Sequence, residues 1–126
     1  MIYGIGVDLV EISRLEQGLV RYGEHYADRI LAPDEHADFF SSTEPARFLA
    51  KRFAAKEAFA KAAGTGLRHP VTLRNIGIRH TTLGQPCFQF SNEMETWLTK
   101  QNIAGHYLSI SDEHAHVIAF VVLEKS

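Results

Sequence analysis

The chain has 126 residues, enough for one hydrophobic core and too few for two, so we expect a single domain over residues 1–126. Its 45% hydrophobic and 22% charged residues are ordinary for a globular protein, and a net charge of −2 gives no reason to expect nucleic-acid binding. One cysteine excludes an internal disulfide and a cysteine-based metal cage. With neither a basic leader nor a long apolar run at the start, we expect a cytoplasmic protein that does not enter a membrane.

Alternating side chains predict a strand from Ile2 to Val10. One side of this strand is apolar and is expected to be well packed: Tyr3, Ile5, Val7 and Leu9. The other side carries Gly4 and Gly6, and glycines inside a strand let a ligand or another backbone approach closely. Asp8 ends this glycine face, so we expect its carboxylate to line a site. The alternative is that Asp8 only caps the helix that follows.

A first helix is predicted from about Glu11 to Tyr22 by its single apolar stripe. Arg14 and Arg21 lie two turns apart on another face of it. They are either solvated surface charges or a docking site for an acidic partner. A second, short helix is expected to begin at Pro33, with acidic residues in its first turn.

A long helix is predicted in the stretch from Ala46 to Gly66, with Pro45 just inside its start and Gly64 at its far end. Arg52 and Lys56 fall within its apolar arc, Glu57 lies at the edge, and Lys61 follows one turn later. A buried charge needs a charged partner, a metal ion or a cleft, so we expect this helix to line something polar. The alternative is that the long stems of Arg52 and Lys56 cover apolar surface and place their charges in water.

The rest of the chain has the texture of strands, with one helix between them. Strands are expected within residues 71–80, 87–90, 108–111 and 116–123, and the helix is capped by Ser91 or Asn92. The last strand is almost wholly apolar, which predicts a central place in its sheet. The order β, four helices, β, β, α, β, β predicts an α+β fold in which an antiparallel-rich sheet packs against the long helix.

Two carboxylates, Asp8 and Glu57, are the main candidates for chemistry. The seven histidines lack metal-binding spacing, and no nucleophile or dinucleotide motif is present. Two carboxylates with Lys61 and Arg52 nearby are what a Mg²⁺-held phosphate or diphosphate needs, because Mg²⁺ takes one or two carboxylates plus substrate oxygens.

Two motifs resemble those of the 4′-phosphopantetheinyl transferases in their short, single-domain form. The first is GVDLVEISR, from Gly6 to Arg14, and the second is FAAKEAFAKA, from Phe53 to Ala62. Both occur in the family's order and spacing, and the resemblance runs essentially end to end. It implies the fold of that family and an enzyme of fatty acid biosynthesis. The implied reaction moves 4′-phosphopantetheine from coenzyme A to a serine hydroxyl of apo-acyl carrier protein and releases 3′,5′-ADP.

The resemblance also implies roles for individual residues. Asp8 and Glu57 would hold Mg²⁺ on the diphosphate of coenzyme A, Lys61 would neutralise phosphate charge, and Glu57 or a metal-bound water would take the serine proton. The further contacts implied for coenzyme A are Arg52, Lys61, Gly64, Gly84 and Pro86. Arg14 and Arg21 would dock the acidic carrier protein.

The resemblance further implies a homotrimer with coenzyme A in the cleft between neighbours. In that arrangement we expect Asp8, Glu57 and Lys61 from one chain, and Arg52 with the turn at residues 84–86 from the next. The competing interpretation is a non-catalytic module that binds a nucleotide or a carrier protein. The presence of both carboxylates favours the enzyme, because a simple anion binder gains nothing from them.

One position departs from the family pattern. The family usually has a histidine two residues before the serine or threonine of the penultimate strand, where this chain has Tyr107 before Ser109. His106 is displaced by one residue, which turns a strand side chain to the opposite face. We therefore assign His106 no role.

Overall fold

The computed structural model describes all residues from 1 to 126 and has the expected α+β architecture. Its elements are β1 (Ile2–Glu11), α1 (Ile12–Tyr22), α2 (Glu24–Ile30), α3 (His36–Ser41), α4 (Pro45–Ala63), β2 (Ile76–His80), β3 (Pro86–Phe90), α5 (Asn92–Lys100), β4 (Ile103–Asp112) and β5 (His116–Lys125). Two 3₁₀ turns, Pro33–Glu35 and Leu73–Asn75, precede α3 and β2. The predicted order of strands and helices is confirmed, although no sequence pattern located a helix at the position of α2.

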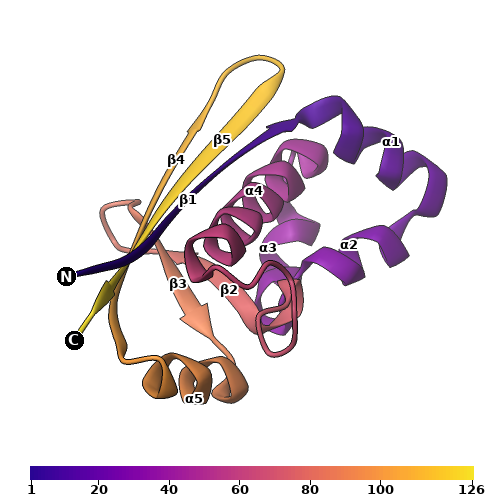
Figure 1. The fold of residues 1–126 in the computed structure, drawn as a ribbon. Helices are drawn as coiled ribbons and strands as arrows, with labels where there is room; N and C mark the ends of the chain where they lie inside the picture. The colour runs from indigo at the N-terminus through magenta and orange to yellow at the C-terminus, as the bar shows by residue number, and fades with distance from the viewer.

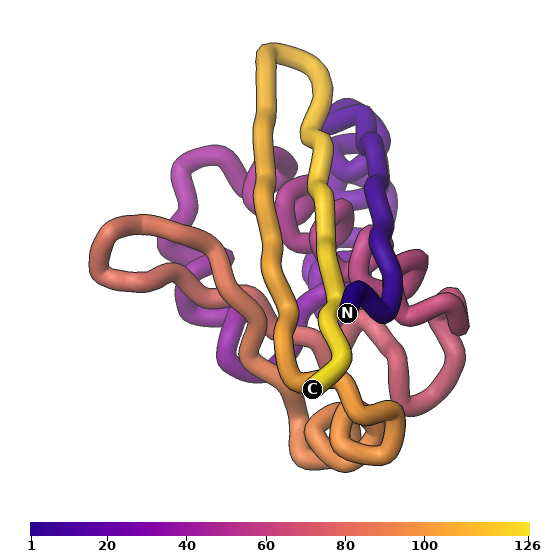
Figure 2. The backbone as a smooth tube through the Cα atoms, turned by 60° about the vertical axis from the view of Figure 1, so that its left-hand side comes forward, coloured from indigo at the N-terminus to yellow at the C-terminus, as the bar shows by residue number.

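The strands form two antiparallel sheets. The larger has the order β1-β5-β4, so the apolar last strand is central, as predicted, and β2 pairs with β3 in a separate hairpin. Helix α4 lies against β1 and β5, and α1, α2 and α3 pack on α4 (Figure 1). Figure 2 shows the three long strands side by side, with the β2–β3 hairpin beyond β4, on the side away from β1. No helix combines the length and apolar character needed to cross a membrane.

Helix α4 approaches β1 very closely, and two glycines make this possible. A Cβ on Gly6 would lie 2.7 Å from the amide nitrogen of Ala62, and one on Gly4 would lie 3.1 Å from the carbonyl carbon of Ala62. Of the two uses predicted for these glycines, the structure therefore shows the approach of another backbone. The facing side of α4 is made of small buried residues, including Ala58 and Ala62, which keeps the two backbones close.

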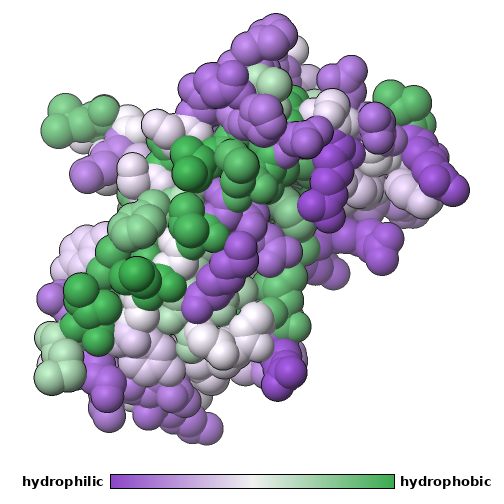
Figure 3. Space-filling view, turned by 45° about the horizontal axis from the view of Figure 1, so that its top comes forward, coloured by the Kyte–Doolittle hydropathy of each residue, from purple (hydrophilic) through white to green (hydrophobic).

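The side of β1 that was expected to be well packed faces outward, so that prediction is wrong for a single chain. Ile5, Val7 and Leu9 are 59%, 47% and 65% exposed. On β5, Phe120 stands opposite Val7 and Ile118 opposite Leu9, and both are also exposed. The glycine face takes the helix, which leaves an apolar face on the other side of the sheet. Figure 3 shows hydrophobic side chains gathered in a diagonal band on the surface.

Several predicted boundaries are shifted. Helix α4 ends at Ala63, because Gly64 adopts a left-handed conformation with φ of 81° and closes the helix, so the prediction to Gly66 was too long. Strand β2 begins only at Ile76, since Leu73–Asn75 forms a 3₁₀ turn. The first helix begins one residue later than predicted.

Candidate active site

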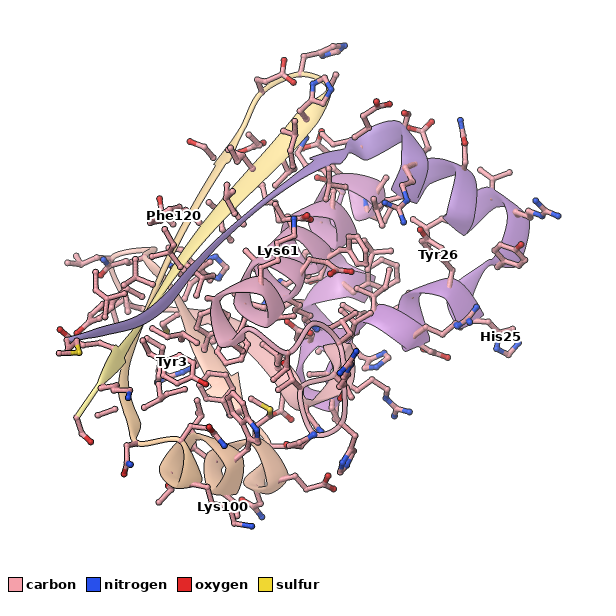
Figure 4. All side chains as sticks on the ribbon, viewed as in Figure 1. Tyr3, His25, Tyr26, Lys61, Lys100 and Phe120 are labelled. Carbon is pink, nitrogen blue, oxygen red and sulfur yellow. The ribbon has the colours of Figure 1, made fainter.

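Asp8 and Lys61 meet where β1 crosses α4. The Nζ atom of Lys61 donates to Oδ1 of Asp8 and to the carbonyl oxygen of Val7, each at 3.0 Å. The Asp8 side chain is 16% exposed and that of Lys61 is 55% exposed, so the pair lies at the surface with the carboxylate mostly covered. Figure 4 shows Lys61 on α4, beside the strand β1. Helix α1 begins without a side-chain cap, so Asp8 does not cap it.

Glu57 lies within electrostatic reach of this pair. Burial raises the pKa of Glu57, and the negative charge of Asp8 raises it further, while Lys61 and Arg14 oppose the shift. Asp8, Glu57 and Lys61 are therefore brought together as predicted, with Arg14 close by. A carboxylate whose charge is disfavoured by burial and by a second carboxylate nearby is a suitable place for a divalent cation.

The donor set fits Mg²⁺ better than a transition metal. The structure has no cluster of three or more His, Cys, Asp or Glu side chains that could hold a metal ion. A cation on Asp8 and Glu57 would have two protein carboxylates and open positions for waters and substrate oxygens. That is the coordination Mg²⁺ accepts and zinc sites do not use.

The two arginines of the first helix are both exposed on α1, which packs on α4. The guanidinium of Arg14 lies 5.4 Å from the centre of the Phe53 ring, and that of Arg21 lies 5.3 Å from the Tyr22 ring. Arg14 therefore sits on the side of α1 toward Glu57, and Arg21 extends the positive surface away from it.

Arg52 and Lys56 form a buried ionic network with Glu35, so the alternative that they place their charges in water is wrong. Glu35, Arg52 and Lys56 are 2%, 5% and 0% exposed. Lys56 Nζ lies 2.6 Å from Oε1 of Glu35 and Arg52 Nη1 lies 3.0 Å from Oε2. Burial lowers the pKa of Lys56 to about 8, against the effect of Glu35. Glu35 was missed, because its sequence position indicated only a favourable acid in a first helical turn.

Arg52 also lines a cavity of about 220 Å³ on the β4 side of α4. Its wall carries four basic groups, Arg47, Lys51, Arg52 and His80, and one carboxylate, that of Glu44. Burial, together with Arg52 and Lys51, lowers the pKa of His80, so the positive charge comes from the other three groups. Arg47 and Lys51 share Asp112, at 2.7 and 3.5 Å.

The remaining predicted contacts for coenzyme A lie apart from one another. Gly64 is three residues beyond Lys61, at the end of α4. Gly84 has a φ of 87° in the turn of the β2–β3 hairpin, and Pro86 begins β3 opposite His80. This hairpin lies beyond β4, across the sheet from β1 (Figure 2). Within one chain, Arg52 and the hairpin turn are thus on one side and Asp8, Glu57 and Lys61 on the other.

His106 and Tyr107 face opposite ways, as expected for neighbours in a strand. His106 is half-buried with its ring edge-on to Phe90 at 4.9 Å between ring centres, and burial lowers its pKa. The hydroxyl of Tyr107 donates to Oε1 of Glu124 at 3.0 Å on the exposed side. Neither side chain contacts Asp8, Lys61 or Arg52 through a hydrogen bond.

Comparison with known proteins decides the family. The ACPS family model, described as the 4′-phosphopantetheinyl transferase superfamily, matches residues 4–121. The chain belongs to the 4′-phosphopantetheinyl transferase superfamily. Among its relatives in this superfamily, the holo-[acyl-carrier-protein] synthase of Thiobacillus denitrificans is 56% identical, over 100% of this chain and 96% of that protein. That of Nitrosospira multiformis is also 56% identical, over 99% and 100%.

Solved structures of this superfamily have the same fold. The holo-[acyl-carrier-protein] synthase of Neisseria meningitidis gives a TM-score of 0.97 at 50% identity, covering 99% of this chain and 100% of that one. The enzyme of Bacillus anthracis, solved in complex with CoA (3′,5′-ADP), gives 0.83 at 34% identity, covering 100% and 99%. The enzyme of Helicobacter pylori, solved with coenzyme A, gives 0.82 at 29% identity, covering 95% and 99%.

Proposed function

We propose that the protein is a holo-[acyl-carrier-protein] synthase. It transfers 4′-phosphopantetheine from coenzyme A to a serine of apo-acyl carrier protein, in the cytoplasm and for fatty acid biosynthesis. The observation that carries the proposal is the grouping of Asp8, Glu57 and Lys61 on β1 and α4, in a chain that matches such synthases along its whole length. In the reaction the serine oxygen attacks the β-phosphorus, the bond to the α-phosphate oxygen breaks, and 3′,5′-ADP leaves.

The chain's own residues account for binding and proton transfer. Lys61 is held by Asp8 and Val7 yet half-exposed, so its ammonium can contact a phosphate oxygen. Glu57, or a water held by the metal ion, would take the serine proton. We place Mg²⁺ on Asp8 and Glu57, where it would stabilise the charge that develops on the 5′-phosphate of the leaving 3′,5′-ADP.

The nucleotide end of coenzyme A is assigned to a neighbouring chain. The Arg52 cavity and the Gly84–Pro86 turn lie across the sheet from Asp8, so one chain does not offer both halves to one ligand. The exposed apolar face of β1 and β5 gives copies of the chain a surface to bury. A homotrimer in which one chain's carboxylates meet the next chain's Arg52 satisfies both observations.

The carrier protein is assigned to the first helix. Arg14 and Arg21 are exposed on α1, and Arg14 influences Glu57, so an acidic partner docked there would lie next to the reacting groups. Arg14 is the arginine that lies near the carboxylates, while Arg21, two turns further along α1, adds to the attraction of the acidic carrier protein.

The test is to incubate the protein with apo-acyl carrier protein, coenzyme A and Mg²⁺ and to weigh the carrier. We expect a gain of one phosphopantetheine group, and no gain with EDTA or with a carrier whose serine is replaced by alanine. Asp8→Ala and Glu57→Ala should each remain folded and lose most of kcat, on the order of several kcal/mol of transition-state stabilisation. Binding of coenzyme A without any mass gain would instead identify a non-catalytic module.

A further inference from the structure

Glu35 is the centre of the buried ionic network, and both of its carboxylate oxygens are fully used. Oε1 accepts hydrogen bonds from Lys56 Nζ at 2.6 Å and from the amide of Ala32 at 2.7 Å. Oε2 accepts from Arg52 Nη1 at 3.0 Å and from the amide of Ile78 at 2.9 Å. Each oxygen thus binds one cation and one backbone amide, which fixes the carboxylate in a single orientation.

Arg52 is anchored through one nitrogen only. Its Nη1 donates to Glu35 and to the carbonyl oxygen of Ile78, and its guanidinium lies 4.6 Å from the centre of the Phe48 ring. Nε and Nη2 make no hydrogen bond within the chain, yet no buried side-chain nitrogen or oxygen lacks a partner. These two nitrogens are therefore reachable from the cavity that Arg52 lines. One edge of the guanidinium is held by the protein, and the other is open to a ligand.

Lys56 has a supporting part in this arrangement. It is fully buried and also donates to the carbonyl oxygen of Ile30 at 2.6 Å, so it cannot reach a ligand itself. Its ammonium holds Oε1 of Glu35, which prevents the carboxylate from turning its Oε2 away from Arg52. With two cations and one carboxylate, the network keeps one positive charge uncompensated beside the cavity. An anionic ligand would supply the missing negative charge.

We infer that Glu35 is a positioning residue, which holds Arg52 so that its free edge binds the phosphorylated nucleotide end of coenzyme A. The inference rests on the proposed function, since it presumes that coenzyme A is the ligand of the Arg52 cavity. It assigns the function of positioning to a residue outside both sequence motifs. A flat guanidinium is required because it must bind protein and ligand on two different edges.

The test is the double variant Glu35→Gln/Lys56→Met, which removes the carboxylate together with the cation that would be left buried and unpaired. We expect the KM for coenzyme A, and the Kd for 3′,5′-ADP by calorimetry, to rise about tenfold or more through loss of a fixed charge-assisted contact. The kcat and the KM for the carrier should stay nearly unchanged. Glu93→Gln is the matched control, because it removes an equally short contact, 2.6 Å to His69, on the distant helix α5.

The possible outcomes separate the inference from the proposed function. If the folded double variant binds 3′,5′-ADP as tightly as the wild type, the positioning role alone is overturned. A fall in kcat with an unchanged KM for coenzyme A would also overturn it, because that is the result expected of a purely structural role. Wild-type protein that neither binds 3′,5′-ADP nor modifies the carrier overturns both. If the double variant does not fold, Arg52→Lys decides the matter. Its ammonium can still pair with Glu35 but cannot present a second edge, so wild-type affinity in that variant would also refute the role.

Discussion

Gly6 lies where β1 touches α4, and a methyl group at this position has no room. A Cβ there would lie 2.7 Å from the amide nitrogen of Ala62 and closer still to the carbonyl oxygen of Ala58. Both atoms belong to the helix backbone, so in Gly6→Ala the helix must move away by about 0.7 Å or more to reach the ordinary contact distance of 3.4 Å. Overpacking of this kind costs about 1–3 kcal/mol. The Tm should fall by roughly 4 °C for each kcal/mol.

The same shift should damage catalysis more than stability. Asp8 is on β1 whereas Glu57 and Lys61 are on α4, so moving the helix separates the groups that must act together. Misplacement by about 1 Å can cost on the order of 100-fold in rate. We would measure urea unfolding and, under conditions where the variant is fully folded, kcat by the mass of the modified carrier. Wild-type kcat in folded Gly6→Ala would refute the reasoning.

Gly18→Ala is the matched control for this prediction. Its Cβ would meet the ring of Tyr26 instead of the backbone of α4. It should therefore lower stability through the contact between α1 and α2 without moving Asp8 relative to Glu57. We expect nearly wild-type kcat, and a loss equal to that of Gly6→Ala would show that general destabilisation, not site geometry, controls turnover.

Three further predictions concern the charges of the site. The pKa of Glu57 in the folded, metal-free chain is raised above its ordinary 4.5, so the free energy of unfolding falls as the pH rises and this carboxyl ionises. Bound Mg²⁺ stabilises the ionised carboxylate and offsets this loss of stability. Mg²⁺ should therefore raise the Tm at neutral pH and much less near pH 4.5, and equal shifts would contradict this. Arg21→Glu should raise the KM for the carrier and weaken its salt dependence, with the KM for coenzyme A nearly unchanged; the reverse pattern would exclude carrier docking at Arg21. Mixing inactive Glu57→Ala with inactive Arg52→Ala chains, after dissociation and reassembly, should restore activity, and failure of exchanged oligomers to do so would place both groups in one chain's site.

Local signals predicted the long helix well and its chemistry incompletely. The proline at its start and Gly64 at its end mark α4 correctly, because caps depend on neighbouring residues only. The reason for two cations on its apolar arc could not be predicted, since Glu35 lies 17 and 21 residues before Arg52 and Lys56. A partner this distant in sequence is found only when the fold brings it close.

The strand β1 shows a second limit of sequence reasoning. Alternation separated its two faces correctly, and the glycines indicated that one of them is closely approached. Alternation of side chains does not say which face of a strand meets the core when neither face is clearly charged, and here Asp8 is the only charged residue on either face of residues 2–10. The apolar face was therefore placed inside, although Ile5, Val7 and Leu9 are exposed in the single chain. The carboxylates were grouped correctly because both lie where the glycine face meets α4.

Helix α4 carries charged groups on two of its sides, and this constrains how copies of the chain must meet. Arg52 and Lys56, four residues apart, face Glu35 and β2, whereas Glu57 and Lys61, also four residues apart, face β1. In the proposed homotrimer one ligand uses both sides, so the β1 side of one chain would meet the β4 side of another. Such a contact joins two different surfaces, so its repetition gives a ring, as in the proposed homotrimer, where the rotation closes, and an open filament where it does not. In the proposed ring each interface would hold one complete site, so the number of sites would equal the number of chains. A chain kept monomeric should retain Asp8, Glu57 and Lys61 in place and keep its Arg52 cavity, so it should still bind 3′,5′-ADP yet lose the transfer of 4′-phosphopantetheine.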